Sequence, residues 1–197
     1  MHLNIFRYFY KLAIPALLCS ATIGIAARPA FSTLAHSAVH VSWQGRPIPP
    51  TPLDTKIAAA GFYQIGRDGV LTGRRTLDQI FEQAMTFQYT RDGAADQWQA
   101  PSVTDRLKRG DCEDMAIWIY RELVRSGYAN VRIMVGKFET SEKNYHTWVV
   151  CPAAGSDDFI VDPALQRRIW KRSDLSPDVY LPLFSFDGRK KYLHAAQ

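Results

Sequence analysis

The sequence predicts an α+β domain in which two helices precede an antiparallel sheet. Apolar residues recur at helical spacing over residues 76–88 and again over 111–126, as they do on the buried face of a helix. Three later runs, 131–138, 145–151 and 158–162, are rich in β-branched and aromatic residues and are typical of strands. Because the helices and strands are segregated along the chain, an α+β plan is favoured.

Both helices carry residues that commonly begin and end helices. Thr76 is expected to cap the first helix and Asp111 the second, since their side-chain oxygens can accept from free backbone N–H groups. Asp114 adds an acid to the first turn, where the helix dipole favours negative charge. Gly127 is expected to end the second helix, because glycine readily adopts the left-handed conformation found there.

The predicted strands at 145–151 and 158–162 are expected to pair as an antiparallel hairpin. Their connection, residues 152–157, contains proline and glycine, which are common in turns. This pairing would place His146 and Asp162 opposite each other at the same end of the hairpin. Residues 180–186 predict a final strand that covers the core.

Two stretches are predicted to lack regular structure. Five prolines fall within residues 28–56, so residues 33–75 are expected to be an extended arm or linker. Residues 89–105 are expected to form a long loop, because Gly93 and Pro101 interrupt any periodicity. Loops of this length usually carry function or cover a site.

Residues 1–32 are predicted to be a signal peptide. Arg7 and Lys11 precede an apolar run, 12–27, that is interrupted by a proline and is too short to span a membrane comfortably. A basic start, a short apolar segment and small residues after it are typical of secretory signals. The alternative is an uncleaved N-terminal anchor in contact with the inner membrane. In both cases the folded domain, residues 76–197, is expected to be periplasmic or secreted.

The composition excludes several classes of protein. The chain has 197 residues, 47% apolar and 22% charged, which argues against disorder and against a polytopic membrane protein. Three cysteines are too few for a disulfide-built scaffold. The net charge of +5 falls when Arg7, Lys11 and Arg28 are set aside, leaving 21 basic against 19 acidic residues. No nucleic-acid partner is therefore expected.

The most informative segment is the Gly-Asp-Cys-Glu-Asp run at 110–114. Cys112 falls in the first turn of the second predicted helix, where the positive end of the helix dipole favours a thiolate. His146 is the one histidine of five in the predicted core. Asp162 can orient its imidazole, which makes a Cys-His-Asp arrangement for nucleophilic catalysis.

Each of these residues also has a structural explanation. Cys112 alone fits a small buried residue, and the acids beside it oppose thiolate formation unless a cation compensates. Cys112 and Cys151 can also form a disulfide, since export exposes proteins to oxidising conditions. The protein would then be a non-catalytic binding module. A zinc site built from Cys112, His146, Cys151 and Asp162 lacks the close ligand pairs that zinc sites use.

The Gly110–Asp114 run, with the upstream stretch Phe87–Asp92, Trp98 and Pro101, resembles the bacterial transglutaminase-like cysteine peptidases. The similarity extends from about residue 76 to residue 170. This resemblance implies a papain-like core with a cysteine opening a helix that packs on an antiparallel sheet.

The resemblance also implies the roles of the site residues. Cys112 would be the nucleophile, His146 the base and Asp162 the orienting acid. The expected reaction is hydrolysis of amide bonds in a protein or peptide substrate, such as a surface or envelope protein, through a thioester. Resolution of the thioester by an amine, as in a protein-glutamine transglutaminase, is the alternative.

Calcium is implied in the same way. In the adhesin-releasing periplasmic members of the family, acids that flank the cysteine bind calcium, and Asp111 and Glu113 match those positions. No cofactor is required for the chemistry itself. The runs His146–Trp148 and Val161–Pro163 are closer to the broader transglutaminase-like core than to the adhesin-cleaving relatives.

An acyl-transfer mechanism needs two donors for the oxyanion. The backbone N–H of Cys112 is expected to be one. The predicted loop supplies Gln97, Trp98 and Gln99 as candidates for the second, or for substrate binding. Trp98 also fits a core or lid residue.

Overall fold

The computed structural model describes residues 45–49, 51–66, 74–93, 95–139, 144–153 and 157–194. All of them belong to one compact unit, Ser37–Gln197. The predicted signal peptide, residues 1–32, lies outside the described residues. Among the described residues, no helix is both long enough and apolar enough to cross a membrane.

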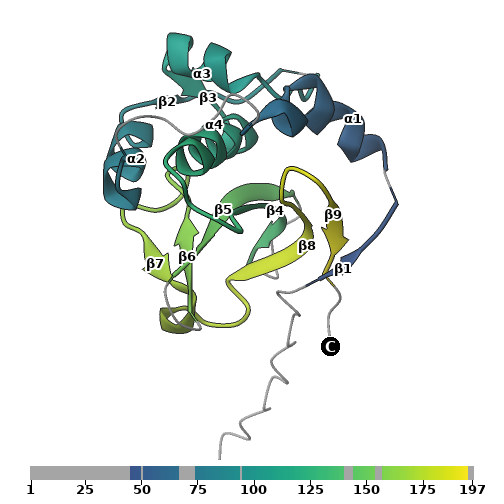
Figure 1. The fold of residues 1–197 in the computed structure, drawn as a ribbon, viewed down its shortest axis with the longest axis vertical. Coiled ribbons are helices and arrows are strands. Elements are labelled where there is room, and N and C mark those ends of the chain that lie inside the picture. The colour runs from purple at the N-terminus through teal and green to yellow at the C-terminus, as the bar shows by residue number, and fades with distance from the viewer. Residues whose placement is uncertain are drawn as a thin grey trace, which may run out of the picture. The chain divides into compact units, whose positions relative to one another are not determined.

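Seven strands form one antiparallel sheet (Figure 1). Its spatial order is β1-β9-β8-β4-β5-β6-β7. The strands are β1 Arg46–Pro47, β4 Arg132–Phe138, β5 His146–Pro152, β6 Asp158–Val161, β7 Trp170–Lys171, β8 Tyr180–Phe186 and β9 Lys191–Leu193. The predicted mixture of helices and antiparallel sheet is confirmed. The strand at 180–186 lies beside β4, so the chain crosses back over the sheet after β7.

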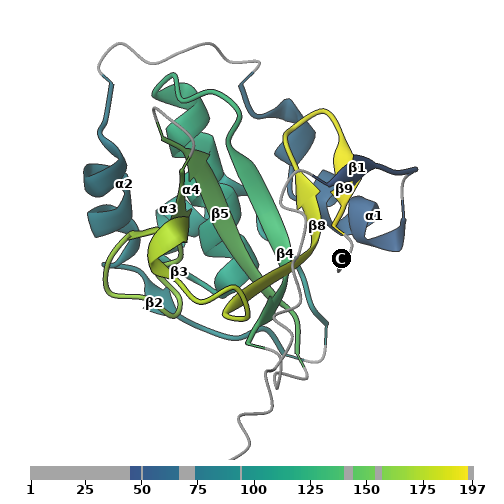
Figure 2. The same cartoon turned by 90° about the horizontal axis from the view of Figure 1, so that it is seen from below.

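The helices precede most of the sheet in the chain. They are α1 Pro52–Ala59, α2 Leu77–Ala84, α3 Pro101–Leu107 and α4 Cys112–Arg125, with short 3₁₀ turns η1 Phe62–Gln64 and η2 Arg172–Asp174. Figure 2 shows α4 behind β4 and β5, with α2 and α3 on the same side. Thr76 caps α2 as predicted, accepting from the Gln79 N–H at 3.2 Å.

The central strands are buried on both faces. Side chains that alternate along β4 and β5 divide into two clusters. The cluster against α4 includes Ile119, Ile133 and Val149. The cluster on the opposite face comprises Met134, Trp148, Val150, Ile160 and Tyr180. This double burial explains the continuous apolar runs in the sequence.

The expectation of an extended arm at 33–75 is corrected within its described part. Residues 52–59 form α1, and the side chain of Ile57 is buried in the main core. The ammonium group of Lys191 on β9 lies 3.0 Å from a carboxylate oxygen of Asp54 on α1. Lys191 is only 4% exposed, so this ion pair joins the N-terminal segment firmly to the C-terminal hairpin.

The expectation of an uninterrupted loop at 89–105 is also corrected. Pro101 begins α3, because a proline at the first helical position lacks only an N–H that would be free anyway. Ahead of it, β2 (Gln88–Tyr89) pairs in parallel with β3 (Arg109–Gly110). This pairing brings residues 88–92 alongside the turn that leads into α4.

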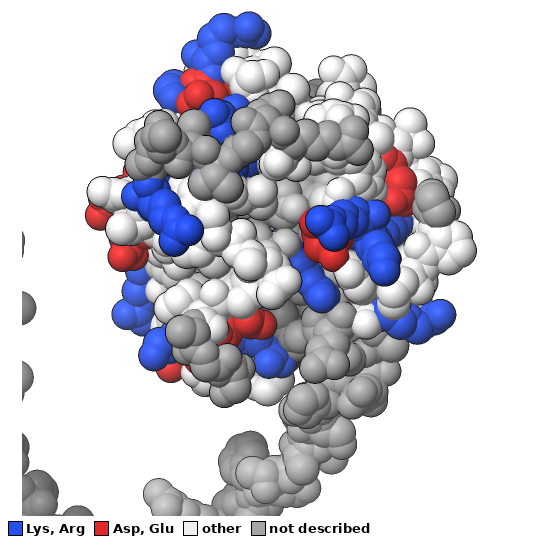
Figure 3. All heavy atoms as spheres, viewed as in Figure 1, with Lys and Arg blue, Asp and Glu red and all other residues white. Residues whose placement is uncertain are grey.

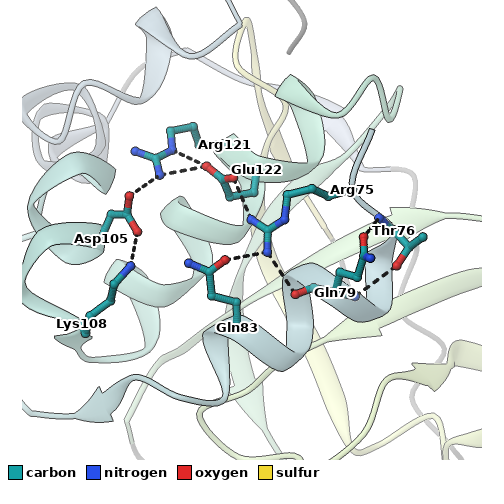
Figure 4. Close-up of polar contacts among 8 residues, drawn as sticks. All are labelled: Arg75, Thr76, Gln79, Gln83, Asp105, Lys108, Arg121 and Glu122. Atoms are coloured by element: carbon teal, nitrogen blue, oxygen red, sulfur yellow. Dashed lines mark hydrogen bonds and ion pairs between the residues drawn. The ribbon is translucent and has the colours of Figure 1, made fainter. Parts of the chain in front are cut away.

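A network of charged side chains ties the helices together (Figure 4). Arg75, just before α2, lies 3.0 Å from Glu122 on α4. Arg121 lies 2.8 Å from Glu122 and 3.5 Å from Asp105 on α3. Asp105 also holds Lys108 at 2.5 Å. The network therefore fixes the end of α3, directly ahead of the segment that carries Cys112.

Surface charge is dispersed on the face drawn in Figure 3. Lys and Arg side chains form several separate groups there, and Asp and Glu side chains lie next to most of them. Charges of both signs in close alternation produce no extended positive field over this face.

Gly136 permits the close approach of β4 and β8. The register shifts between Val135 and Gly136, and a Cβ at Gly136 would lie 2.0 Å from the carbonyl oxygen of Leu181. We expect Gly136→Ala to reduce the free energy of unfolding by about 3 kcal/mol, measured by urea denaturation. Gly93→Ala is the control, because a Cβ there meets nothing within 4 Å. Equal stability of the two variants would contradict the expectation.

Candidate active site

Cys112 is the first residue of α4, and the residues around it form a compact helix start. The backbone N–H of Asp111, the capping residue, donates to Asp114 Oδ2 at 3.4 Å. A Cβ at Gly110 would lie 2.5 Å from the Asp114 Cβ, so glycine is needed for this packing. Three residues of the Gly-Asp-Cys-Glu-Asp run, Gly110, Asp111 and Asp114, thus have a structural reason that is separate from any role of the cysteine.

Asp114 is fully buried, and Gln99 holds it. The Gln99 backbone N–H donates to Asp114 Oδ1 at 2.7 Å, and the Gln99 side-chain amide donates to Oδ2. Burial raises the pKa of Asp114 to about 6, although both hydrogen bonds from Gln99 act in the opposite direction. The amide of Gln99, one predicted oxyanion donor, therefore serves the start of α4.

The other two candidates from this segment differ, because among the described residues the indole of Trp98 has a partner whereas only the backbone N–H of Gln97 does. Gln97 is exposed, and its backbone N–H donates to the Asp92 carboxylate. Trp98 is half-buried against the main core, and its side chain hydrogen-bonds Asp96. The indole N–H of Trp98 is thus engaged by a carboxylate.

The thiol of Cys112 lies between Glu113 and the start of β5. Its S–H donates to Glu113 Oε2, with a sulfur–oxygen distance of 3.0 Å. The backbone N–H of Thr147, which follows His146, is directed at the sulfur. Burial, followed by the Glu113 charge, raises the pKa of the Cys112 thiol far above its ordinary value. Activation of this thiol therefore requires positive charge nearby.

His146 and Asp162 are in direct contact. His146 Nε2 lies 2.8 Å from Asp162 Oδ2, which leaves Nδ1 as the nitrogen available to a thiol. The expected register needs correction, because Val149 pairs with Val161. Continued by one residue, this register places Asp162 opposite Trp148. Asp162 therefore contacts His146 diagonally across the strand pair. Because His146 lies two residues from Trp148, the side chains of His146 and Asp162 are on the same face of the sheet.

Asp162 is 1% exposed and is surrounded by donors. The Tyr180 hydroxyl donates to Oδ2 at 2.7 Å, and the Leu165 backbone N–H donates to Oδ1 at 3.3 Å. The imidazole of His146 also stacks on Trp148, with ring centres 6.1 Å apart and an interplanar angle of 17°. The ring orientation is therefore fixed from two directions. Tyr180, which the sequence indicated only as a strand residue, belongs to this site.

Cys112 and Cys151 are both free, which removes the disulfide considered from the sequence. Cys151 lies four residues beyond Thr147 on β5. At about 3.3 Å per strand residue, that is roughly 13 Å away. The Cα atoms of a disulfide lie within about 7 Å of each other, so the geometry forbids the bridge.

Three carboxylates gather beside Cys112. Oxygens of Asp92, Asp111 and Glu113 all lie within 4.8 Å of one another. Burial and the neighbouring acids raise the pKa of both Asp111 and Glu113. Asp111 Oδ1 is buried and has no hydrogen-bond partner among the described residues. Hard cations favour such oxygen sets, so the donors fit a cation such as calcium.

Asp92 was not among the metal ligands predicted from the sequence. It lies 19 residues before Asp111 and reaches it through the β2–β3 pairing, where the Asp92 N–H lies 3.3 Å from Asp111 Oδ2. Asp114, the third acid of the run, is held by Gln99 and lies outside the group.

Comparison with solved structures identifies the fold. Neither protein-family models nor curated proteins match the chain. Three structures of Legionella pneumophila LapG match with TM-scores of 0.52 to 0.53 and sequence identities of 24% to 25%. They cover 74% to 76% of this chain and 80% to 81% of LapG, and one is calcium-bound and another EGTA-treated. The chain therefore has the fold of LapG.

A more distant match is a candidate cysteine protease from Cytophaga hutchinsonii. Its sequence identity is 11% and its TM-score is 0.39, over 71% of this chain and 43% of that one. This similarity is too low to carry an argument.

Tyr180 tests the buried contacts of Asp162. Tyr180→Phe keeps the ring and removes one donor from a buried carboxylate, so we expect a loss of about 1–2 kcal/mol in unfolding free energy. The control is Tyr128→Phe, because Tyr128 is half-buried and its hydroxyl has no hydrogen bond to a described residue. Chemical denaturation of both variants provides the comparison. An unchanged midpoint for Tyr180→Phe would show that its hydroxyl does not stabilise Asp162.

Proposed function

We propose that the protein is an exported cysteine peptidase of the transglutaminase-like type. Cys112 acts as the nucleophile, His146 as the base and Asp162 as the orienting acid. The observation that carries this proposal is the 2.8 Å contact between Nε2 of the partly buried His146 and Oδ2 of the buried Asp162, close in the fold to a cysteine at a helix start. Export is proposed from the pattern of residues 1–32.

The proposed reaction is acyl transfer. The Cys112 thiol passes its proton to His146 Nδ1, and the sulfur bonds to the carbonyl carbon of the substrate amide. As the carbon–nitrogen bond breaks, the leaving amine takes the proton from Nδ1. Water, losing a proton to His146, then attacks the thioester carbon. The carbon–sulfur bond breaks and returns the thiol with a carboxylic acid product.

Asp162 contributes by holding His146. Its charge favours the imidazolium that forms during each step, and its contact with Nε2 selects the tautomer in which Nδ1 can accept a proton. Tyr180 and the N–H of Leu165 keep the carboxylate in place. A papain-like core, with α4 packed on the antiparallel sheet, is the scaffold that this proposal assumes. The LapG fold supports it.

Amine transfer is the second candidate function. The runs His146–Trp148 and Val161–Pro163 resemble the broader transglutaminase-like core, and the same thioester can be resolved by an amine instead of water. Incorporation of a fluorescent primary amine into casein, dependent on Cys112, would favour cross-linking. Release of casein fragments without incorporation favours hydrolysis.

Calcium is proposed to bind Asp92, Asp111 and Glu113. A LapG structure is calcium-bound, and the donors of this chain fit the ion. When bound, the ion supplies positive charge beside the acids that disfavour the Cys112 thiolate. The residues of the chain perform each chemical step.

Replacing the nucleophile tests the proposed activity. We expect p-nitrophenyl acetate to acetylate Cys112 of the wild type, with turnover, and denatured casein to be cleaved. Cys112→Ser should lose at least 10³-fold in both rates, an order of magnitude typical for a catalytic nucleophile. Cys151→Ser is the matched control and should retain activity, since Cys151 is buried and distant from the site. Activity that survives in Cys112→Ser would refute the proposed nucleophile.

Calcium binding is expected to raise thermal stability. At 100-fold excess over Kd, a ligand stabilises by about 2.7 kcal/mol, which for a domain of this size is a rise in Tm of roughly 5–10 °C. Differential scanning fluorimetry in calcium and in EGTA measures the shift. Asp92→Asn should largely abolish it, whereas Asp174→Asn, an exposed acid on η2, should not. A calcium shift of equal size in both variants would exclude the proposed ligand set.

A further inference from the structure

The second oxyanion donor is a gap in the proposed active site. The backbone N–H of Cys112, at the start of α4, supplies the first. Two donors from the preceding segment are already engaged, the indole of Trp98 by Asp96 and the amide of Gln99 by Asp114. The side-chain amide of Gln97, which is exposed, and the hydroxyl of Tyr89 remain as donors near the start of α4.

Tyr89 lies beside Gly110, in the segment that leads into α4. Its Cα is the partner of Gly110 in the parallel β2–β3 pair, and the next N–H, of Thr90, donates to the Gly110 carbonyl at 2.9 Å. Gly110 is two residues from Cys112. In Figure 1 the β2–β3 pair lies on one side of α4 and β5, which carries His146, on the other.

This placement matches the direction that the chemistry requires. The leaving nitrogen of the substrate must face His146 Nδ1, because it takes its proton there. The carbonyl oxygen is a different substituent of the same carbon and is directed away from the imidazole. A donor on the β2 side of α4 therefore leaves the imidazole free for the leaving nitrogen.

The Tyr89 side chain is available for this role. It is 44% exposed, so its ring is not consumed by core packing. Arg91 hydrogen-bonds its hydroxyl, and because a guanidinium can only donate, the Tyr89 O–H proton remains free for another acceptor. Burial and the nearby Cys112 raise the pKa of the Tyr89 phenol, so it stays protonated.

We propose that Tyr89 is the second oxyanion donor, a catalytic residue that hydrogen-bonds the substrate carbonyl oxygen through its hydroxyl. This inference rests on the proposed function of Cys112. As the sulfur–carbon bond forms, the carbonyl π electrons move to oxygen, which accepts hydrogen bonds from the Cys112 N–H and the Tyr89 O–H. The electron pair returns when the leaving group departs. Tyr89 keeps its proton throughout.

Two reagents separate this role from an effect on the thiol. p-Nitrophenyl acetate transfers its acetyl group to Cys112 through a tetrahedral oxyanion and releases p-nitrophenolate. Iodoacetamide alkylates the same sulfur by displacing iodide from a saturated carbon, and no oxyanion forms. Loss of an oxyanion donor therefore slows the first reaction and leaves the second unchanged.

The test compares Tyr89→Phe with wild type in both reactions, with calcium present. We expect the acylation rate to fall on the order of 10²-fold, the usual effect of removing one oxyanion donor, and alkylation to stay within about twofold. Tyr145→Phe is the matched control, since Tyr145 is also exposed, at 64%, and directly precedes His146. Its two rates should both remain near the wild-type values. Intact-mass spectrometry confirms that Cys112 is the residue modified.

Three results would overturn the inference. Acylation of Tyr89→Phe at the wild-type rate would show that the hydroxyl does not contact the oxyanion. Equal slowing of acylation and alkylation would show that Tyr89 acts on the thiol. A wild type whose Cys112 is alkylated but never acetylated would refute the proposed function together with this inference.

Discussion

The buried carboxylate of Asp162 is the interaction on which the site and much of the sheet depend. It accepts from the His146 ring on β5, from the Tyr180 hydroxyl on β8 and from the Leu165 N–H after β6. A charge that is only 1% exposed is stable when such donors surround it. Because β5 and β8 flank β4 on either side, this one side chain links β5 to β8 across β4 while it orients the imidazole.

The start of α4 presents the opposite situation, because acidic side chains gather there beyond what the donors among the described residues balance. Gln99 satisfies Asp114, but Asp92, Asp111 and Glu113 face one another beside the Cys112 thiol. Each of these carboxylates, when ionised, raises the free energy of ionising the other two. Together they also disfavour the Cys112 thiolate. A bound cation resolves both conflicts at once. The proposed calcium site and the proposed nucleophile are therefore parts of one electrostatic arrangement.

Local rules predicted the helix starts at Thr76 and Asp111 and the central strands, since these depend on neighbouring residues. The sequence also indicated the candidate residues Cys112, His146 and Asp162. Features that depend on distant contacts were missed. Ile57 of α1 packs in the core, and Asp54 of the same helix pairs with the distant Lys191 on β9. Asp92 joins Asp111 through the β2–β3 pairing. Pro101 predicts a loop by local rules, but proline is also common at the first helical position, where the structure places it. The hairpin register differs because Pro152, which the sequence assigned to the connection, pairs with Asp158.

The pH dependence of Cys112 alkylation by iodoacetamide, measured with calcium in the wild type and in His146→Ala, tests the cysteine–histidine pair most directly. An imidazolium that shares the thiol proton keeps the sulfur reactive below the ordinary thiol pKa of about 8.5. We predict that wild-type Cys112 reacts rapidly at pH 6–7 and that His146→Ala reacts at a comparable rate only at higher pH. Superimposable profiles for the two proteins would contradict the cysteine–histidine pair and leave the similarity to LapG as one of fold alone.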